Sequence, residues 1–190
     1  MKTRKILLPS DVKEISNKNF SYETYITMYG NSTFIPNKNK EDRIINKDLY
    51  SAIKFSEQAG LSYNSFDKKL EYLIDKEYII SNDNEFIINN KINTSYVLSD
   101  SKTIKKLLDK KIKNIIRVFI IYCKYTNLFG QCTLTQKEVL EQIGLKNNSK
   151  NLAALRNINN ALEELGLIEI KRSRKKVAGK LVTYLNIKKI

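Results

Sequence analysis

The sequence predicts an α+β fold that is mainly α-helical with small β-hairpins and is arranged as two domains in tandem. Apolar residues recur at helical spacing along most of the chain, and short runs of β-branched residues follow the helical stretches. Charge is also divided unequally. Residues 1–95 hold 14 basic and 13 acidic side chains, whereas residues 96–190 hold 20 basic and 7 acidic ones. We therefore expect a near-neutral N-terminal domain over 1–95 and a basic C-terminal domain over 96–190.

The first elements of the C-terminal domain follow from apolar spacing and capping residues. Apolar residues at helical spacing predict a helix over 111–127, which Gly130 separates from a short strand over 132–135. Thr135 followed three residues later by Glu138 has the pattern of a capping box. A second helix should therefore begin directly after the strand.

A polar turn and a longer helix come next. Gly144 is expected to close the second helix. Ser149 is a candidate N-cap for a third helix over 149–165, and Gly166 is placed to end it. The apolar residues of this third helix fall on one stripe, so its opposite face should be exposed and polar.

Two strands with a basic segment between them complete the domain. Residues 167–170 and 181–187 predict the strands, and residues 171–180 are expected to form a basic hairpin loop. The order helix, strand, helix, turn, helix, strand, loop, strand is that of a winged helix, an elaboration of the helix-turn-helix. The third helix is then the expected recognition helix, and residues 171–180 are the expected wing.

The N-terminal domain contains a fainter copy of this order. The segment from Ala59 to Ser65 matches the segment from Ile143 to Ser149 in its central glycine and polar turn. In both halves a helix and then a β-branched strand follow, and in the N-terminal copy residues 85–88 supply a second strand after an acidic turn. We therefore expect two winged helix-turn-helix domains in tandem, the first with a short acidic hairpin in place of a wing.

Other parts of the N-terminal half are less regular. Residues 89–95 are polar and have no apolar period, so they are the expected linker. Three tyrosines at helical spacing, Tyr22, Tyr25 and Tyr29, are expected to serve packing rather than catalysis. Residues 1–20 have no assigned role, although their apolar stretch from Ile6 to Leu8 could pack on the first domain or pair with another chain.

The polar face of the predicted recognition helix carries the side-chain types that read base edges. Asparagine pairs with adenine, arginine or lysine with guanine, and small apolar groups contact thymine methyls. Asparagine is also a poor mid-helix residue, which suggests a compensating benefit. The alternative is that A/T-rich codons enrich asparagine, lysine and isoleucine without any function. The expected base-contacting residues are Lys150, Asn151, Ala154, Arg156, Asn157 and Asn160.

The predicted wing concentrates positive charge in one hairpin. Like charges at this density repel one another, and contact with phosphates or the minor groove would relieve that cost. A solvated, solubilising loop is the alternative interpretation. The expected wing contacts are Lys171, Arg172, Arg174, Lys175, Lys176 and Lys180.

The corresponding helix of the N-terminal domain has a mixed face, on which acidic residues would oppose phosphates. This pattern favours protein contact, including homodimerisation, or a weaker DNA role for the first domain. The residues expected on that face are Asn64, Asp67, Lys68, Lys69, Glu71 and Tyr72.

Several classes of function are not expected. The chain has no histidine, so His-based triads are excluded, and its six glycines form no phosphate-binding loop. Two cysteines, Cys123 and Cys132, are expected to be reduced and partly buried rather than zinc ligands. We expect no enzyme activity, no cofactor or metal and no membrane partner. The expected location is the cytoplasm, with nucleoid association when the protein binds DNA.

The C-terminal domain also resembles known proteins. The residues that carry the resemblance run from Leu134 to Leu145 and from Ala161 to Ile168. They are similar to tandem winged-helix initiators of plasmid replication and to winged-helix regulators of phages and mobile elements in AT-rich Gram-positive bacteria. If the protein is an initiator, the resemblance implies binding to repeated origin sites and recruitment of host replication proteins.

The sequence therefore predicts a non-enzymatic protein that binds double-stranded DNA sequence-specifically. Replication initiation and transcriptional regulation, with host replication or transcription proteins as partners, both remain open. A protein–protein adaptor that uses winged-helix domains without specific DNA binding is the alternative from a different class.

Overall fold

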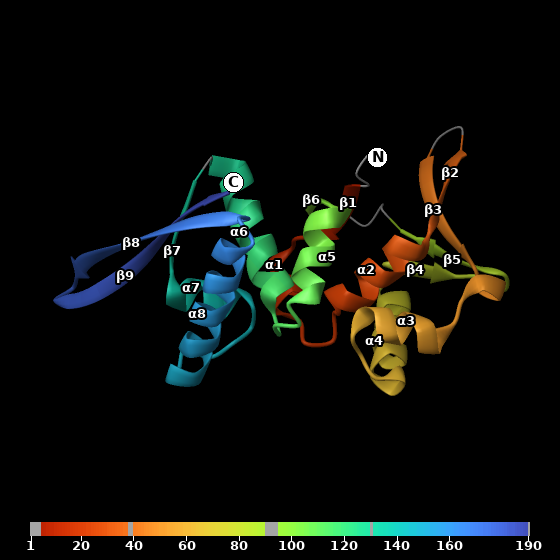
Figure 1. The fold of residues 1–190 in the computed structure, drawn as a ribbon, viewed down its shortest axis with the longest axis horizontal. Helices are drawn as coiled ribbons and strands as arrows, with labels where there is room; N and C mark the ends of the chain where they lie inside the picture. The colour runs from red at the N-terminus through yellow and green to blue at the C-terminus, as the bar shows by residue number, and fades with distance from the viewer. Residues whose placement is uncertain (1–4, 38–39, 90–94, 130, 190) are drawn as a thin grey trace. The chain divides into compact units, whose positions relative to one another are not determined.

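The computed structural model describes residues 5–37, 40–89, 95–129 and 131–189, and these form an α+β chain with small β-sheets (Figure 1). The chain is divided into two compact units. Unit 1 comprises Met1–Leu8, Lys18–Thr94 and Leu98–Ser101, and unit 2 comprises Pro9–Asn17, Ser95–Val97 and Lys102–Ile190. Unit 1 carries 13 basic and 12 acidic residues, whereas unit 2 carries 21 and 8. Nearly all of the net positive charge therefore belongs to unit 2.

Unit 2 is built from helices that cover one face of a sheet with strand order β7-β9-β8. The covered face is apolar, with Ile168, Ile170 and Leu185 buried on it. The other face carries the polar side chains of Thr133, Ser173 and Asn186. The elements of this unit are α1 (Val12–Ser16), α5 (Ser101–Asp109, with Ser101 assigned to unit 1), α6 (Ile115–Phe129), β7 (Cys132–Thr135), α7 (Gln136–Gln142), α8 (Ser149–Glu164), β8 (Ile168–Val177) and β9 (Lys180–Lys189).

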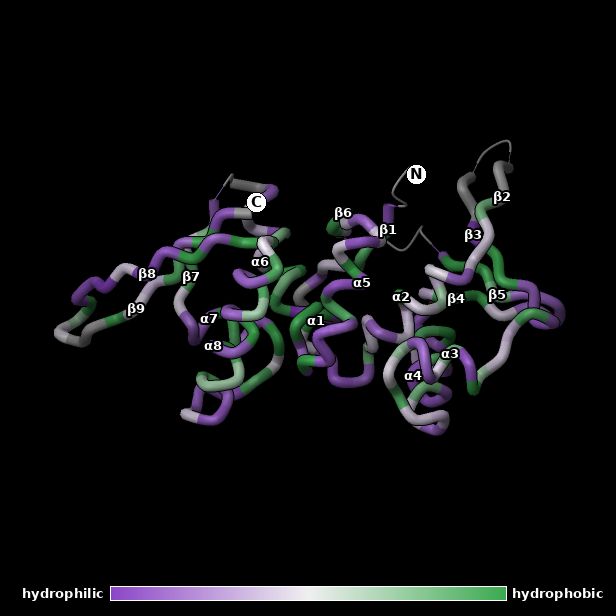
Figure 2. Tube along the Cα trace, in the orientation of Figure 1, coloured by the Kyte–Doolittle hydropathy of each residue, from purple (hydrophilic) through white to green (hydrophobic). Residues whose placement is uncertain are grey.

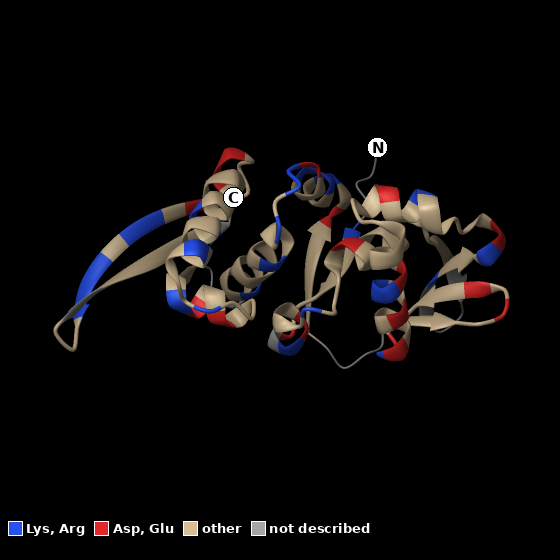
Figure 3. Cartoon of the chain, turned by 90° about the horizontal axis from the view of Figure 1, so that it is seen from below, with Lys and Arg blue, Asp and Glu red and all other residues tan. Residues whose placement is uncertain are grey.

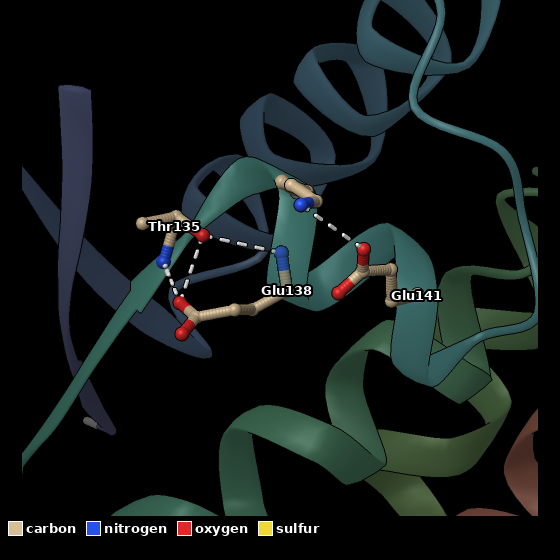
Figure 4. Close-up of polar contacts among 4 residues, drawn as sticks. Thr135, Glu138 and Glu141 are labelled. Atoms are coloured by element: carbon tan, nitrogen blue, oxygen red, sulfur yellow. Dashed lines mark hydrogen bonds and ion pairs between the residues drawn. The ribbon is translucent and has the colours of Figure 1, made fainter. Parts of the chain in front are cut away.

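The capping and helix predictions for unit 2 are confirmed with small shifts. Thr135 caps α7 in a complete capping box with Glu138, as Figure 4 shows. Helix α6 begins at Ile115 rather than at residue 111, because Lys111 and Asn114 have positive φ angles of 52° and 65° that interrupt a helix. The predicted cap of α8 was wrong by one residue, since the Asn148 side chain accepts the capping hydrogen bond.

The prediction of a loop over 171–180 was wrong. Residues 171–177 belong to β8, which pairs with β9 over ten residue pairs, and only Ala178 and Gly179 form the turn. Both turn residues have positive φ, as a two-residue hairpin of the type I′ kind requires. The partners across the ribbon include Val182, Thr183 and Tyr184, whose high β-propensity stabilises a strand that the basic residues alone do not indicate. The predicted wing is therefore a long two-stranded ribbon.

Unit 1 repeats the element order of unit 2 with additions. Its core elements run helix, strand, helix, helix, strand, strand, and the strands of this set are ordered β3-β5-β4, as β7-β9-β8 are in unit 2. The predicted strand over 85–88 is confirmed. The elements are β1 (Lys5–Pro9, with Pro9 assigned to unit 2), α2 (Tyr22–Asn31), β2 (Thr33–Asn37), β3 (Lys40–Asn46), a 3-10 turn (Lys47–Leu49), α3 (Ala52–Ala59), α4 (Tyr63–Asp75), β4 (Ile79–Ser81), β5 (Glu85–Ile88) and β6 (Tyr96–Asp100, with Tyr96 and Val97 assigned to unit 2).

The two units also end their matching helices in the same way. Gly60 after α3 and Gly144 after α7 both have left-handed φ angles, of 67° and 72°. In each case the glycine N–H and the next N–H donate back to the last turn of the helix, which is the Schellman motif. After α8 the motif uses Gly166, whereas after α4 the same position is Glu77 with φ 57°. The internal similarity expected from the sequence therefore extends to backbone geometry.

Some features of the first half were not predicted. The hairpin of β2 and β3 adds an edge to the sheet of unit 1, and β1 pairs with β6. Most of the expected linker, at residues 90–94, lies outside the described residues. Tyr22, Tyr25 and Tyr29 are all buried, so their expected packing role is confirmed.

Helix α1 comes from the N-terminal part of the chain but belongs to unit 2. The Arg117 guanidinium on α6 donates to the carbonyl oxygens of Glu14, Ile15 and Asn17, and its Nη2 lies 2.8 Å from the oxygen of Asn17. These carbonyls lie at the C-terminal end of α1 and in its C-cap residue, where a short helix has few intrahelical donors; the Glu14 oxygen also accepts from the Asn17 N–H at 3.1 Å. The Ile15 side chain is fully buried. A fragment that starts at residue 96 would lack this part of unit 2.

The close approach of α1 to α7 makes one glycine of unit 2 more sensitive than another. A Cβ atom added at Gly144 would lie 2.5 Å from the Ser16 carbonyl oxygen, whereas one added at Gly166 meets nothing within 4 Å. We expect Gly166→Ala to lower the free energy of unfolding by about 1–2 kcal/mol through the left-handed backbone alone. Gly144→Ala should lower it further, because α1 must also move. Urea unfolding of the full chain measures both, and an equal loss in the two variants would contradict the close packing of α1.

Candidate nucleic-acid interface

Helix α8 presents a straight exposed stripe. Residues at spacings of three and four lie on one side of a helix, and five exposed residues of α8 follow this spacing. Ala154 and Arg156 are also exposed and flank them. We call this set of five the α8 stripe: Lys150, Ala153, Asn157, Asn160 and Glu164.

Small and amide side chains dominate the middle of the α8 stripe. Ala153 was not among the residues expected from the sequence, although its spacing of four from Asn157 would have identified it. Together with Ala154 it lets another surface approach the helix backbone closely. Asn157 and Asn160 can each donate and accept hydrogen bonds in the same plane, which is the geometry that a base edge requires.

Two of the helix asparagines have roles inside the protein. Asn151 is half-buried, and its Nδ2 donates to the carbonyl oxygen of Lys146 at 2.8 Å, which fastens the turn before α8. Asn159 is fully buried, and its Oδ1 accepts from the Tyr122 hydroxyl at 2.8 Å. These contacts explain why Asn151 and Asn159 are present in a helix without requiring either of them to contact a base. Asn151 is therefore explained by its contact with Lys146 and is not among the proposed base-contacting residues.

The orientation of α8 is fixed at both ends and at its centre. The Asn148 side chain accepts from the N–H of Asn151 at 2.9 Å at the N-terminal end. Near the C-terminal end, the Glu163 carboxylate accepts from the Ile170 N–H at 3.1 Å and joins α8 to β8. The bond between Tyr122 and Asn159 adds a buried polar contact between α6 and α8. Together these three contacts hold the exposed stripe in one orientation.

The basic side chains of the ribbon divide between its two faces. Successive residues of a strand point to opposite faces, so Arg172, Arg174 and Lys176 share the face of the buried Ile168 and Ile170. We call this the helix-side face, because the helices cover it where the ribbon joins the sheet. In Figure 3 the blue segments of the ribbon lie along one of its strands, and Figure 2 shows that strand as hydrophilic.

The position of Arg172 is supported by its electrostatic effect on a helix residue. Burial raises the pKa of the Tyr122 hydroxyl on α6 well above its ordinary value, and the Arg172 charge acts on that group in the opposite direction. This effect agrees with the strand alternation, which puts Arg172 on the same face as the buried Ile168 and Ile170.

Lys171 and Lys175 point to the opposite face, which we call the outer face. There the Lys171 ammonium lies 3.3 Å from a Glu169 carboxylate oxygen, and the Lys175 ammonium lies 6.0 Å from the ring centre of Tyr184. The side chain of Lys180, the remaining expected wing contact, is outside the described ones. The six expected wing residues thus do not form a single surface.

Polar side chains join the strands on the outer face. The Asn186 amide donates to Ser173 Oγ at 3.0 Å, and its Oδ1 accepts from the Thr133 hydroxyl at 3.0 Å. This chain of contacts spans β7, β9 and β8 and stiffens the base of the ribbon. The outer face therefore has a structural role of its own.

Metal-binding side-chain types are scattered over the residues that the structure describes. Within them no three His, Cys, Asp or Glu side chains gather as a metal site would require. Cys123 and Cys132 are buried free thiols, and burial raises the pKa of the Cys132 thiol to about 12. Over the same residues no helix is both long and apolar enough to cross a bilayer.

The corresponding surface of unit 1 differs in kind. On α4, Asn64, Lys68 and Glu71 are exposed, whereas Asp67 and Tyr72 are only partly so. Lys69 donates to the carbonyl oxygen of Lys18 at 2.6 Å, which turns its charge toward the protein. The hairpin at the position of the ribbon, β4 with β5, spans only three and four residues in the part of unit 1 that the structure describes.

Comparison with known proteins adds no assignment. Neither the models of protein families nor the curated protein sequences give a match to this chain.

Proposed function

We propose that unit 2 is a winged-helix domain that binds double-stranded DNA sequence-specifically, with α8 in the major groove and the ribbon of β8 and β9 as its wing. Two units with the same helix and strand order, and the same sheet order, support a tandem winged-helix architecture. The observation that carries the proposal is the adjacency of two surfaces. The α8 stripe offers amide and small side chains. The helix-side face of the ribbon offers alternating cations, and its strand β8 is hydrogen-bonded to α8 through Ile170 and Glu163.

The proposed contacts fall into two groups. Ala153, Ala154, Arg156, Asn157 and Asn160 read base edges, while Lys150 at the N-terminal end of the stripe contacts phosphate. Arg172, Arg174 and Lys176 contact the backbone or the minor groove. No enzymatic step is part of this proposal.

Unit 1 is proposed to make protein contacts, including homodimerisation. Its mixed α4 surface does not favour phosphate, and it exposes large apolar side chains near the start of α3, with Leu49 and Ile53 exposed by 78% and 65%. In the biological role proposed, a dimer brings two basic units to one DNA molecule. Replication initiation and transcriptional regulation both use such a protein.

Selection of bound sequences from a random duplex pool tests the proposal. We expect a defined motif to be enriched by the full chain. Iterated copies of that motif in an origin would favour a plasmid or phage replication initiator, and a palindrome over a promoter would favour a regulator. Retention of duplexes without enrichment would remove sequence specificity, and no retention at low salt would favour a protein–protein adaptor.

A further inference from the structure

Unit 2 carries a second concentration of positive charge that lies outside the proposed helix and wing contacts. Residues 102–113 contain six lysines and a single acidic residue, Asp109. Resting on the proposed function, we propose that α5 and the turn after it form a phosphate-binding surface for duplex DNA that flanks the segment read by α8. The lysines are Lys102, Lys105, Lys106, Lys110, Lys111 and Lys113.

Helix α5 separates its apolar and basic residues between two faces. Ile104 and Leu107 are buried, with 1% and 0% of their surface exposed. Lys102, Lys105 and Lys106 are exposed. The helix therefore anchors itself through an apolar side and presents its lysines to solvent.

One ion pair places this basic surface beside α8. The Lys110 ammonium lies 2.9 Å from a carboxylate oxygen of Glu164, which is the last residue of the α8 stripe. Lys110 is therefore at the C-terminal end of the same surface that would face DNA. Lys111 and Lys113 follow directly and are exposed.

The ion pair also has an electrostatic consequence for DNA binding. Glu164 is the acidic residue of the α8 stripe and would repel phosphates that lie beside the end of the helix. Lys110 neutralises it, and the neighbouring lysines then make the local charge positive. Lysines this close repel one another, and phosphates placed between them would relieve the repulsion. The counterions released from the DNA would add to the affinity.

A charge-matched pair of variants of the full chain tests this surface. The first replaces Lys105, Lys106, Lys111 and Lys113 by glutamine, and the second replaces four exposed lysines of unit 1, Lys18, Lys54, Lys68 and Lys76. Affinity for a duplex that extends well beyond the selected site is measured across salt concentrations, and thermal unfolding checks that both variants are folded.

The two variants are expected to differ. The first should bind the long duplex about 10- to 100-fold more weakly at low salt and should lose about 2–4 from the salt slope, because each phosphate contact contributes about 0.9. The second should stay within about twofold of the wild type, since the proposed DNA contacts do not include unit 1. The deficit of the first variant should shrink on a duplex trimmed to the selected site.

Other outcomes would overturn the inference. Equal losses in both variants would show a net-charge effect, and an unchanged slope in the first variant would show that α5 does not contact DNA. An acidic protein segment would then be the better candidate for this surface. In either case a wild-type protein that still binds duplex DNA leaves the proposed function standing, whereas a wild type that binds none removes both.

Discussion

Replacing Arg172 and Arg174 by glutamine is expected to weaken duplex binding far more than replacing Lys171 and Lys175, although both pairs remove two positive charges. The arginines lie on the helix-side face of β8, the strand that is hydrogen-bonded to α8 through Glu163 and Ile170. The lysines lie on the outer face, beside Glu169 and Tyr184. The position of a charge, and not its number, should therefore decide the effect.

The magnitude follows from the phosphate contacts. Loss of two contacts should reduce the salt slope by about 2 and weaken binding about 10- to 100-fold at moderate salt, equally on specific and random duplexes. The lysine pair should change affinity by no more than about twofold. Fluorescence anisotropy across a salt series measures both. Equal effects of the two pairs would show that the ribbon binds through both faces or only through net charge.

A second large effect is expected from Asn157 in the α8 stripe and from Arg156, which flanks the stripe. Arg156→Ala and Asn157→Ala should each weaken binding to the selected site by about 1–3 kcal/mol, and should change binding to random duplexes little. The reason is that base contacts are lost while phosphate contacts remain. Competition binding with selected and scrambled duplexes separates the two.

Asn151→Ala is the matched control for this prediction. The Asn151 amide donates to Lys146 in the turn before α8, so its loss should lower the free energy of unfolding by about 1 kcal/mol and leave the preferred sequence unchanged. If Asn157→Ala and Asn151→Ala changed specificity to the same extent, the assignment of the stripe as the reading surface would be wrong.

Local signals in the sequence predicted much of unit 2. The Thr135–Glu138 capping box and the glycines at 144 and 166 act through nearby backbone groups, so their patterns identify helix ends directly. In unit 1 the glycine and polar turn at residues 59–65 indicated the helix that follows, and β-branched runs indicated the last two strands. These elements depend on neighbours within a few residues.

The errors concern contacts that are distant in sequence. A run of lysine and arginine does not look like a strand, and only pairing with Val182, Thr183 and Tyr184 makes residues 171–177 extended. Helix α1 belongs to unit 2 because Arg117, a hundred residues away, binds its carbonyl oxygens. In a single sequence, neither of two such segments shows that the other will lie against it.

The sequence also did not distinguish the α8 asparagines that bond within the protein from those that remain exposed, for a related reason. Helical spacing found the exposed side of α8 but not which asparagines the protein itself uses. Asn151 and Asn159 have partners that only the folded chain brings together, Lys146 across the turn and Tyr122 from α6. Likewise, the two faces of the ribbon appear only once its residues are known to be strand.

The central claim is that unit 2 binds duplex DNA through phosphates and base edges. Titration of the full chain with a labelled random duplex across salt concentrations tests it most directly. With the four contacts proposed for Lys150 and the three cations of the helix-side face, the logarithm of the affinity should fall linearly with the logarithm of the salt concentration with a slope of about −4, and contacts from α5 would make it steeper. Absence of binding at low salt, or an affinity that does not change with salt, would contradict the account.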